Sequence, residues 1–526
     1  MNRDYLIEIK NLTIRKKKST LLKNISMDFI KGKITSIIGS SGIGKTTLLK
    51  TIVGKNKPNS GSVFVKNLNI FQISEKKLYL LRKKITFLFQ NGALFHDMNV
   101  YDNVAFPLRF HTNLKEKYIF KKVYSILEKI KLEKFLKFMP KQLSGGTIRR
   151  VALARCLVSN PELIILDEPF VGQDPKNIEM LLKLIKKASS SMKITFIIVS
   201  HDIKEIMKIS DYIYLISEKS RIIKGTPDFF LKNKNKFVTE FIKGYDFRKK
   251  YSVEFNLKEI EKKIRDKDFL ERFLLFVKKN LLFYKNRIYQ ILKFFFFLLF
   301  KKPNFKNHYK IFIKQIYNIG FLSLSIVIVS AIFIGMILSI QGYTILSHYG
   351  TETILGFLIS VSLFREFGPV ITALLFIGKT SSFLTSEIAF MKTTEQILSL
   401  ELMAINPVKY ILVPRFWMSF ICFPMLVVVF IAVGIYSSSL VAIYWKEIDL
   451  GFFWSAIQNS TDWKKDIIGC FIKSFIFSFF MSCISLLNGY NTVPTTEGIN
   501  IAINRTVVYS SLIILILDFL LTILIF

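Results

Sequence analysis

The sequence predicts an α/β domain followed by an all-α domain of about five membrane spans. The first observation is a glycine-rich loop, GSSGIGKTT, that starts at residue 39 between an apolar run and a helical run; strand–loop–helix units of this kind build parallel α/β sheets. The second is a change of composition near residue 319, after which uncharged stretches long enough to cross a bilayer recur. We therefore expect an α/β domain over 1–243, a charged connector over 244–310 and a membrane domain over 311–526.

The composition agrees with a chain that is partly embedded in lipid. Of its 526 residues 51% are hydrophobic, and the mean hydropathy is +0.36, which is high for a wholly soluble protein. A total of 75 Lys and Arg against 38 Asp and Glu gives a net charge of +37. The lysines are spread widely without interleaved aromatic residues, which favours a general drift toward Lys, Asn, Ile and Phe over nucleic-acid binding; contact with an anionic cytoplasmic leaflet stays open.

The glycine-rich loop fits the phosphate-loop template of glycine, four free residues, Gly-Lys and then Ser or Thr. Glycines let successive backbone N–H groups point at phosphate oxygens, and the following helix adds its positive N-terminal end. Lys45 is expected to reach the β- and γ-phosphates, and the Thr46 hydroxyl is expected to ligate Mg²⁺. The residues expected to bind the nucleotide here are Gly39, Ser40, Ser41, Gly42, Gly44, Lys45, Thr46 and Thr47.

A second anion cradle is predicted at the run LSGGT, where Ser144, Gly145 and Gly146 open a helix. One chain rarely needs two phosphate cradles for one nucleotide. The economical arrangement is a head-to-tail pair of chains, in which each triphosphate lies between one phosphate loop and the partner's serine-glycine turn. The sequence therefore predicts a homodimer.

Two carboxylates follow the continuous apolar run 163–166, which is typical of a strand buried on both faces. Asp167 is placed to hold Mg²⁺ and Glu168 to polarise the attacking water; the alternative is a solvated acidic strand end. After the next buried strand, at 194–199, His201 is expected to contact the γ-phosphate. Gln90, which follows a strand at 85–89, is expected to reach the nucleotide and its metal ion.

The order and spacing of GSSGIGKT, Gln90, LSGGT, LIILDEP, the Gly172-Gln173-Asp174 turn and His201 resemble the ATP-binding cassette (ABC) ATPase. The resemblance implies ATP and Mg²⁺ as cofactors, a phosphate-loop core with an antiparallel β subdomain and a helical subdomain, and a place for Asp174 in the composite nucleotide site. It also implies that Ser144 and Gly146 serve the ATP of the opposite subunit and that Gln90 links the γ-phosphate to the transmembrane partner. Two positions depart from the family pattern: Thr147 replaces the usual glutamine, and no aromatic residue at 14–18 is placed to stack on adenine.

Five membrane spans are predicted at about 319–340, 354–377, 412–443, 465–487 and 507–526. A shorter apolar stretch at 288–300, with lysines at its ends, is expected to lie in the membrane interface. Lysines before the first span place the start of the chain in the cytosol and its end on the far side. The first residues also lack the apolar core of a signal peptide.

The polar stretch 378–414, between the second and third spans, is expected on the cytosolic side. Glu387, Lys392, Glu395 and Glu401 recur on it at helical spacing. We interpret the stretch as a helix on which the ATPase docks, with a solvated loop helix as the alternative.

Ionisable residues inside the predicted spans indicate a functional or structural polar site. Arg365 and Glu366 lie beside a Gly-Pro pair, while Lys473 and Asp518 lie in the fourth and fifth spans. Adjacent helix residues do not face each other, so Arg365 and Glu366 are expected to have different partners. Two readings stay open: a cavity that takes a charged lipid headgroup, or salt bridges that tie the helices together.

The membrane half, with YNIGFLSL, QGY, SLFREFGPV, MKTTEQ, PRFW and NGY followed by VPTTEG, resembles the permease of the Mla family of phospholipid transporters, and DEPFVGQDP resembles its ATPase. This resemblance implies a multi-pass protein of the Gram-negative inner membrane with a cytosolic ATPase and a periplasmic C-terminus. It implies phospholipid as substrate, a role in outer-membrane lipid asymmetry, a periplasmic MlaD-like lipid-binding ring and a small cytosolic MlaB-like subunit. The family's ATPase and permease are usually separate chains, whereas here they are continuous.

The sequence leaves three alternative functions. A soluble ATPase that acts on RNA or ribosomes would carry two cassettes and no spans. An ABC exporter of a different hydrophobic substrate would typically place its membrane half first and use six spans. A membrane scaffold that does not hydrolyse ATP is disfavoured by the intact Lys45, Asp167, Glu168 and His201.

Overall fold

The computed structural model describes residues 5–16, 19–217, 222–232 and 312–525. The connector expected at 244–310 and its interfacial helix at 288–300 lie outside the described residues. The described chain forms two compact units, the first made of 5–232 together with 394–406 and the second of 312–393 together with 407–525. A short segment that lies between two membrane spans in the sequence therefore folds with the N-terminal unit.

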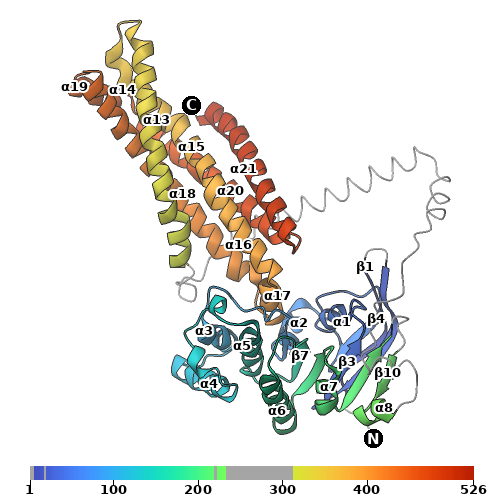
Figure 1. Ribbon diagram of the computed structural model, residues 1–526. Helices are drawn as coiled ribbons and strands as arrows, with labels where there is room; N and C mark the ends of the chain where they lie inside the picture. The colour runs from blue at the N-terminus through green and yellow to red at the C-terminus, as the bar shows by residue number, and fades with distance from the viewer. Residues whose placement is uncertain (1–4, 17–18, 218–221, 233–311, 526) are drawn as a thin grey trace, which may run out of the picture. The chain divides into compact units, whose positions relative to one another are not determined.

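A six-stranded sheet of order β10-β9-β3-β8-β7-β6 is the centre of the first unit (Figure 1). Its inner strands are parallel and only β10 runs antiparallel, to β9. Every residue of β3, β7 and β8 is buried, as the continuous apolar runs predict for strands covered on both faces. The strands are β3 (Ile34–Gly39), β6 (Ile85–Leu88), β7 (Leu163–Asp167), β8 (Thr195–Val199), β9 (Tyr212–Ile216) and β10 (Ile222–Gly225).

A smaller antiparallel sheet of order β2-β1-β4-β5 confirms the expected β subdomain. Its strands are β1 (Tyr5–Lys16), β2 (Ser19–Ile30), β4 (Ser60–Val65) and β5 (Leu68–Asn69). The inward residues of this sheet share one hydrophobic core with Leu48 and Leu49 of the helix that follows the phosphate loop. The N-terminal strands thus pack over the phosphate-loop region.

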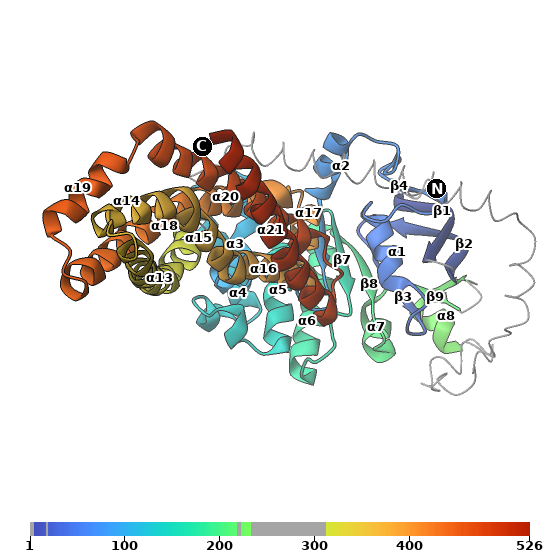
Figure 2. The ribbon, with the colours of Figure 1, turned by 90° about the horizontal axis from the view of Figure 1, so that it is seen from above.

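Helices α3, α4 and α5 pack on one another and form the expected helical subdomain (Figures 1 and 2). Helix α5 also contacts β6 at the edge of the larger sheet. Helix α4 ends at Lys129, and Lys131 then turns the chain with a φ of 55°. The helices of the unit are α1 (Lys45–Ile52), α2 (Glu75–Arg82), α3 (Val100–His111), α4 (Glu116–Lys129), α5 (Gly145–Leu157), α6 (Pro175–Met192), α7 (Ile203–Ile209), α8 (Pro227–Lys232) and α17 (Gln396–Leu402).

The second unit is all helical, and α13, α14 and α18 lie side by side in it (Figure 2). Short π-helical stretches interrupt the spans, one of them at Leu363–Phe367 beside the Gly-Pro pair. The α-helices are α13 (Leu322–Ser347), α14 (Leu355–Ser362), α15 (Gly368–Phe376), α16 (Ser382–Thr393), α18 (Val413–Leu440), α19 (Leu450–Ser460), α20 (Gly469–Asn491) and α21 (Thr496–Ile525).

Five continuous helical segments among the described residues are long and apolar enough to cross a membrane, which confirms the five predicted spans. Each segment begins before its predicted apolar run, and the first four also extend beyond the end of that run. The segments are Phe312–Ser347, Glu352–Thr393, Val408–Trp445, Trp463–Asn491 and Thr496–Ile525.

The prediction of one docking helix across 378–414 is wrong. Residues 378–393 continue the second span helix through α16, and the chain then turns at Glu395, whose φ is 60°. Glu387 contacts a span instead, since its carboxylate accepts bonds of 2.9 and 2.8 Å from the Nε and Nη2 atoms of Arg415. Only α17 is left of the expected helix, and it belongs to the first unit.

Close packing of α13 on α18 gives a test of the fold. A Cβ atom at Gly335 would clash with the Gly434 carbonyl and the Ser437 hydroxyl of α18. We expect Gly335→Ala to destabilise the protein by about 1–3 kcal/mol, because two helix backbones must separate. Gly378→Ala is the control, since its Cβ would meet no atom within 4 Å. Equal melting temperatures for the two purified variants would contradict this packing.

Candidate functional site

The phosphate loop lines a pocket of about 350 Å³ at the carboxyl edge of the six-stranded sheet. The loop joins β3 to α1, and residues far apart in the sequence meet it there. The pocket is lined by Leu21, Ser41, Gly42, Gly44, Lys45, Thr46, Thr47, Gln90, Glu168, Val171, Val199 and His201. Most residues that the sequence assigned to one nucleotide site thus surround one cavity.

Lys45 is buried inside the phosphate loop. Its ammonium group donates to the backbone carbonyls of Gly39 at 2.7 Å and of Ser40 at 2.9 Å. Burial lowers the pKa of Lys45, while Glu168 and Asp167 oppose that shift. The preceding Gly44 has a φ of 104°, a left-handed conformation that explains the need for glycine at this position. The loop therefore holds a cation at its centre, where polyphosphate would bind.

Glu168 enters the pocket through an unusual backbone turn. Successive strand residues point to opposite faces, but Glu168 has a φ of 53°, and this left-handed conformation ends the alternation after Asp167. Its Oε2 accepts from the backbone N–H of His201 at 3.2 Å, and its Oε1 lies 3.2 Å from the His201 Nε2 atom. Strained backbone of this kind is typical of functional sites.

Burial shifts the pKa values of both Glu168 and His201. It raises the pKa of Glu168 to about 7, although the His201 backbone N–H and Lys45 lower it. Burial also lowers the pKa of His201, and Lys45 adds to that shift. The imidazole is therefore neutral at pH 7, while the carboxyl group is poised between its acid and base forms, as a general base requires.

Asp167 supplies a buried carboxylate with one unsatisfied oxygen atom. Its Oδ1 atom has no hydrogen-bond partner among the described residues, and an orphaned buried oxygen is costly unless something binds it. Burial raises the pKa of Asp167, whereas the hydroxyl of Thr46 and the charge of Lys50 lower it. A carboxylate and a hydroxyl oxygen side by side are the ligands that Mg²⁺ prefers, so these residues fit the ion.

Gln90 lies in the pocket on a loop that two arginines of α5 hold. Arg149 donates from Nε to the Gln90 carbonyl at 2.9 Å. Arg155, which is 3% exposed, donates to the carbonyls of Gly92 and Ala93, also at 2.9 Å. Neither arginine is predicted from the sequence, because their partners are backbone carbonyls, which leave no residue pattern in it.

The second anion cradle lies outside this pocket. Ser144 caps α5 by accepting a 3.3 Å bond from the Thr147 backbone N–H, and its hydroxyl lies 2.9 Å from the Thr147 hydroxyl. The unusual threonine is thus part of the helix start. Gly145, Gly146 and Asp174 are also absent from the pocket lining. A single chain therefore does not bring its two cradles to the same cavity.

The short helix α17 is attached to the first unit by polar and apolar contacts. Glu395 forms a 2.7 Å ion pair with Lys50 at the end of α1, and Glu401 pairs with Lys55. The His111 Nε2 atom lies 2.6 Å from the Met403 carbonyl. These contacts attach the last part of the predicted stretch, α17, to the first unit.

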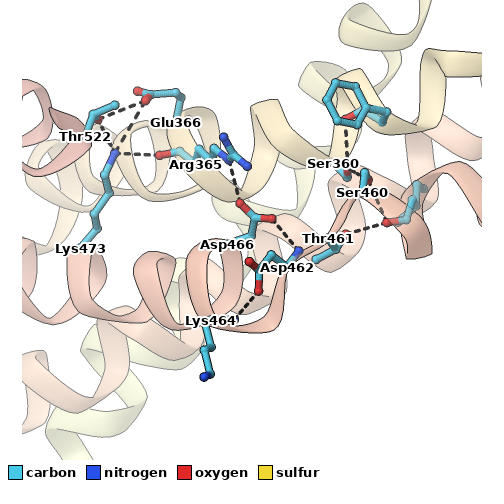
Figure 3. Close-up of polar contacts among 12 residues, drawn as sticks. Ser360, Arg365, Glu366, Ser460, Thr461, Asp462, Lys464, Asp466, Lys473 and Thr522 are labelled. Carbon is cyan, nitrogen blue, oxygen red and sulfur yellow. Dashed lines mark hydrogen bonds and ion pairs between the residues drawn. The ribbon is translucent and has the colours of Figure 1, made fainter. Parts of the chain in front are cut away.

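Arg365 and Glu366 have different partners, as expected for adjacent helix residues (Figure 3). Arg365 donates from Nε to Asp466 at 2.7 Å, and the Asp466 carboxylate is 1% exposed and also accepts the backbone N–H of Asp462 at 2.8 Å. Glu366 accepts a 3.1 Å bond from the Thr522 hydroxyl and lies 3.8 Å from the Lys473 ammonium.

Lys473 is the centre of this membrane cluster and is fully buried. Its ammonium donates to the Arg365 carbonyl at 2.8 Å and to the Thr522 hydroxyl at 2.7 Å (Figure 3). It also donates to Asp518 at 2.9 Å. The cluster joins the second, fourth and fifth spans and contains two cations and three carboxyl groups. It ties the helices together, as one of the two readings predicts, and the side chains of Arg365 and Glu366 stay 31% and 44% exposed.

Comparison with known proteins agrees with both halves of this description. A family profile for ABC transporters matches residues 22–171, and a profile for the permease MlaE matches residues 312–524. The chain belongs to the Mla family of ABC transporters.

Named relatives match the two halves separately. The intermembrane phospholipid transport system permease protein MlaE of Haemophilus influenzae is 48% identical over 228 residues, which cover 43% of this chain and 87% of the relative. The ATP-binding protein MlaF of the same system and organism is 43% identical over 258 residues, which cover 48% of this chain and 98% of the relative. MlaF of Escherichia coli K12 is 41% identical over 239 residues, covering 45% and 89%. The chain thus joins an ATP-hydrolysing half and a permease half.

The pKa of Glu168 gives a pH test of the site. We expect kcat/KM for ATP hydrolysis to fall about tenfold per pH unit below pH 7 and to level off above it, because only the carboxylate form accepts a proton from water. The measurement is steady-state hydrolysis by the purified full-length chain across this range. A pH-independent kcat/KM between about pH 5.5 and 8 would contradict Glu168 as the base.

Proposed function

We propose that the chain is an ATP-driven phospholipid transporter of the bacterial inner membrane that helps to maintain outer-membrane lipid asymmetry. The observation that carries the proposal is that one chain holds two halves, each similar to a component of an intermembrane phospholipid transport system. The first half contains a phosphate-loop pocket with a poised carboxylate, and the second contains five spans. ATP hydrolysis in the first half then supplies the free energy for lipid movement in the second.

In the proposed ATP site, Lys45 exchanges its two carbonyl partners for the β- and γ-phosphates. Thr46, Asp167 and Gln90 would hold Mg²⁺, and the orphaned Asp167 oxygen leaves room for such a ligand. The bound ion would neutralise charge on the phosphates. The backbone N–H groups of Ser41, Gly42 and Gly44 surround the phosphate oxygens.

Glu168 acts as the general base and His201 contacts the γ-phosphate. The carboxylate accepts a proton from water while the water oxygen bonds to the γ-phosphorus, and the bond to the ADP oxygen breaks. His201 is neutral, so it can donate from one ring nitrogen to a phosphate oxygen. The existing contact between the two side chains positions them for this step.

Two copies complete the site. Ser144, Gly145, Gly146 and Asp174 lie outside the pocket that contains Lys45, and we assign them to the ATP of a second copy. A helix that starts with serine and two glycines binds an anion whichever chain the anion belongs to. The proposed assembly is therefore a homodimer with two composite ATP sites.

In the membrane half, Arg365 and Glu366 are proposed to contact the phospholipid headgroup. They are the partly exposed members of a cluster whose Lys473 and Asp466 are buried. A guanidinium group suits a phosphate, and a carboxylate that is 3.8 Å from its nearest cation suits an ammonium group. The remaining members hold these two side chains in place.

The orientation follows from charge. Lysines before the first span favour a cytosolic start, so an odd number of spans places the C-terminus in the periplasm. A periplasmic MlaD-like lipid-binding ring and a small cytosolic MlaB-like subunit are the proposed partners, by analogy with the Mla family.

Replacing Glu168 and Lys45 separates ATP binding from hydrolysis. We expect Glu168→Gln to retain ATP binding and to lower kcat about 100-fold or more, because the amide cannot accept the proton. Lys45→Ala is expected to weaken ATP binding itself. Equilibrium binding of labelled ATP and steady-state hydrolysis measure the two effects. Hydrolysis at the normal rate by Glu168→Gln would refute its role.

Lipid retention tests the headgroup contact. We expect mass spectrometry to find phospholipid on the purified wild-type protein and about tenfold less on Arg365→Ala, because the variant lacks the phosphate partner. Asp466→Asn is the matched control: it removes the same ion pair and keeps the guanidinium group, so it should retain lipid. Equal lipid loss in both variants would show that Arg365 only ties helices together.

A further inference from the structure

Two tight turns contribute to the nucleotide pocket, one at 89–92 after β6 and the other at 170–173 after β7. In each turn the backbone N–H of the fourth residue donates to the carbonyl of the first, at 2.9 Å in the first turn and 3.2 Å in the second. The second residues of the turns, Gln90 and Val171, both line the pocket. Their places in the pocket therefore depend on how the two turns are held.

Arg149 of α5 joins the two turns through one side chain. Its Nε atom donates to the Gln90 carbonyl at 2.9 Å, and its Nη1 atom donates to the Val171 carbonyl. The closing bond of a tight turn uses the carbonyl of its first residue, so the carbonyl of the second residue stays available for another donor. A guanidinium group is planar and presents its donors at fixed positions. Arg149 therefore sets the spacing between the two turns.

The surroundings of Arg149 indicate a role in positioning more than in folding. Arg149 is partly exposed, whereas Arg155, which binds the next two carbonyls of the first loop, is 3% exposed. Gln90 and Val171 are themselves exposed, so water can replace the guanidinium group at their carbonyls. Partly exposed polar contacts of this kind contribute little to the free energy of unfolding.

The second turn also lies next to the strained backbone of Glu168. This residue has a φ of 53°, a conformation that persists only where neighbouring contacts hold it. On the strand side, the Glu168 N–H donates to the Val199 carbonyl at 2.8 Å. On the other side, Arg149 holds Val171, and a Cβ atom at Gly172 would lie only 3.0 Å from the Arg149 Nη1 atom. The guanidinium group therefore packs directly on the segment that follows Glu168.

We propose that Arg149 is a positioning residue for ATP hydrolysis, which holds Gln90 and the segment after Glu168 at the spacing that turnover requires. Arg149 does not line the pocket, so it acts through the two turns. The inference rests on the proposed ATPase site. It adds a residue on which the rate of hydrolysis in that site depends.

Steady-state hydrolysis by the full-length chain in phospholipid nanodiscs tests this role. Arg149→Ala is expected to lower kcat about tenfold and to leave KM for ATP within about threefold of the wild type, because the variant misplaces groups around the bound nucleotide without removing a contact to it. Arg149→Lys is expected to lower kcat by a similar factor, since lysine keeps the charge but lacks the planar pair of donors. The melting temperature of both variants is expected to stay within about 3 °C of the wild type.

A double-mutant cycle shows whether Arg149 acts through Gln90. In a chain that already carries Gln90→Ala, Arg149→Ala is expected to lower kcat only about threefold further, because one of its two partners no longer contributes. Arg150→Ala is the matched control. Arg150 donates to the Thr147 hydroxyl at 3.2 Å and to Asn177 at 3.4 Å, so its effect on kcat is expected to be the same with and without Gln90.

Hydrogen exchange measures the two turns without hydrolysis. The Gly92 and Gln173 amides close the turns. In the full-length chain without ATP, peptides that contain these amides are expected to exchange at least about fivefold faster in Arg149→Ala than in the wild type. Arg150→Ala is expected to leave both peptides unchanged.

Four results would overturn the inference. A normal kcat in Arg149→Ala would show that the residue is dispensable, and a normal kcat in Arg149→Lys would reduce its role to charge. An undiminished tenfold loss in the Gln90→Ala chain would place its action elsewhere, and unchanged exchange in both turns would show that it does not hold them. A wild-type chain that hydrolyses no ATP would instead contradict the proposed function, and the inference with it.

Discussion

The burial of β7 between β6 and β8 is the constraint on which the rest of the ATPase half depends. A parallel strand covered on both faces delivers its carboxyl end to the edge where the phosphate loop also lies. Asp167 and Glu168 are therefore carried out of water beside Lys45, and their pKa values rise because charge is costly there. The same burial that disfavours the carboxylates gives them their chemistry: one keeps an unsatisfied oxygen for a metal ion and the other titrates near neutral pH. Packing and reactivity in this site have a single physical origin.

The path of the chain connects the ATPase half to the membrane half in two places. A long connector keeps an ATPase domain and a membrane domain near each other. It does not by itself pass a movement of one domain to the other. A second connection is made by 394–406, which leaves the membrane unit after α16, folds with the ATPase unit and returns before α18. Apolar side chains such as Leu402 anchor it, and its Glu395 and Glu401 pair with Lys50 and Lys55 of the ATPase unit. The polar cluster around Lys473 has a related role among the spans, where each ion pair satisfies a charge that lipid could not solvate.

The sequence predicts the ATPase fold and most of its pocket because the phosphate loop and buried strands have strict local patterns. Residues 39–47, Asp167, Glu168 and His201 could be assigned from spacing alone, and five apolar runs specified the spans. The other features of the structure depend on contacts between residues whose spacing in the sequence follows no pattern. Arg155 binds backbone carbonyls, and Lys50 pairs with a glutamate 345 residues away in the sequence. The predicted docking helix was too long because Glu387 and Lys392 lie at helical spacing with Glu395 and Glu401 but belong to α16, which continues the second span. The left-handed turn at Glu395 could not be predicted, because no glycine marks that position in the sequence.

The central claim is that ATP hydrolysis in the first half drives phospholipid movement in the second half of the same chain. The most direct measurement places the purified full-length protein in vesicles with a fluorescent phospholipid and records lipid movement and phosphate release in the same sample. The account predicts that lipid moves in proportion to the ATP hydrolysed and that a non-hydrolysable ATP analogue gives no sustained movement. Steady hydrolysis with lipid movement that is the same with and without ATP would contradict it.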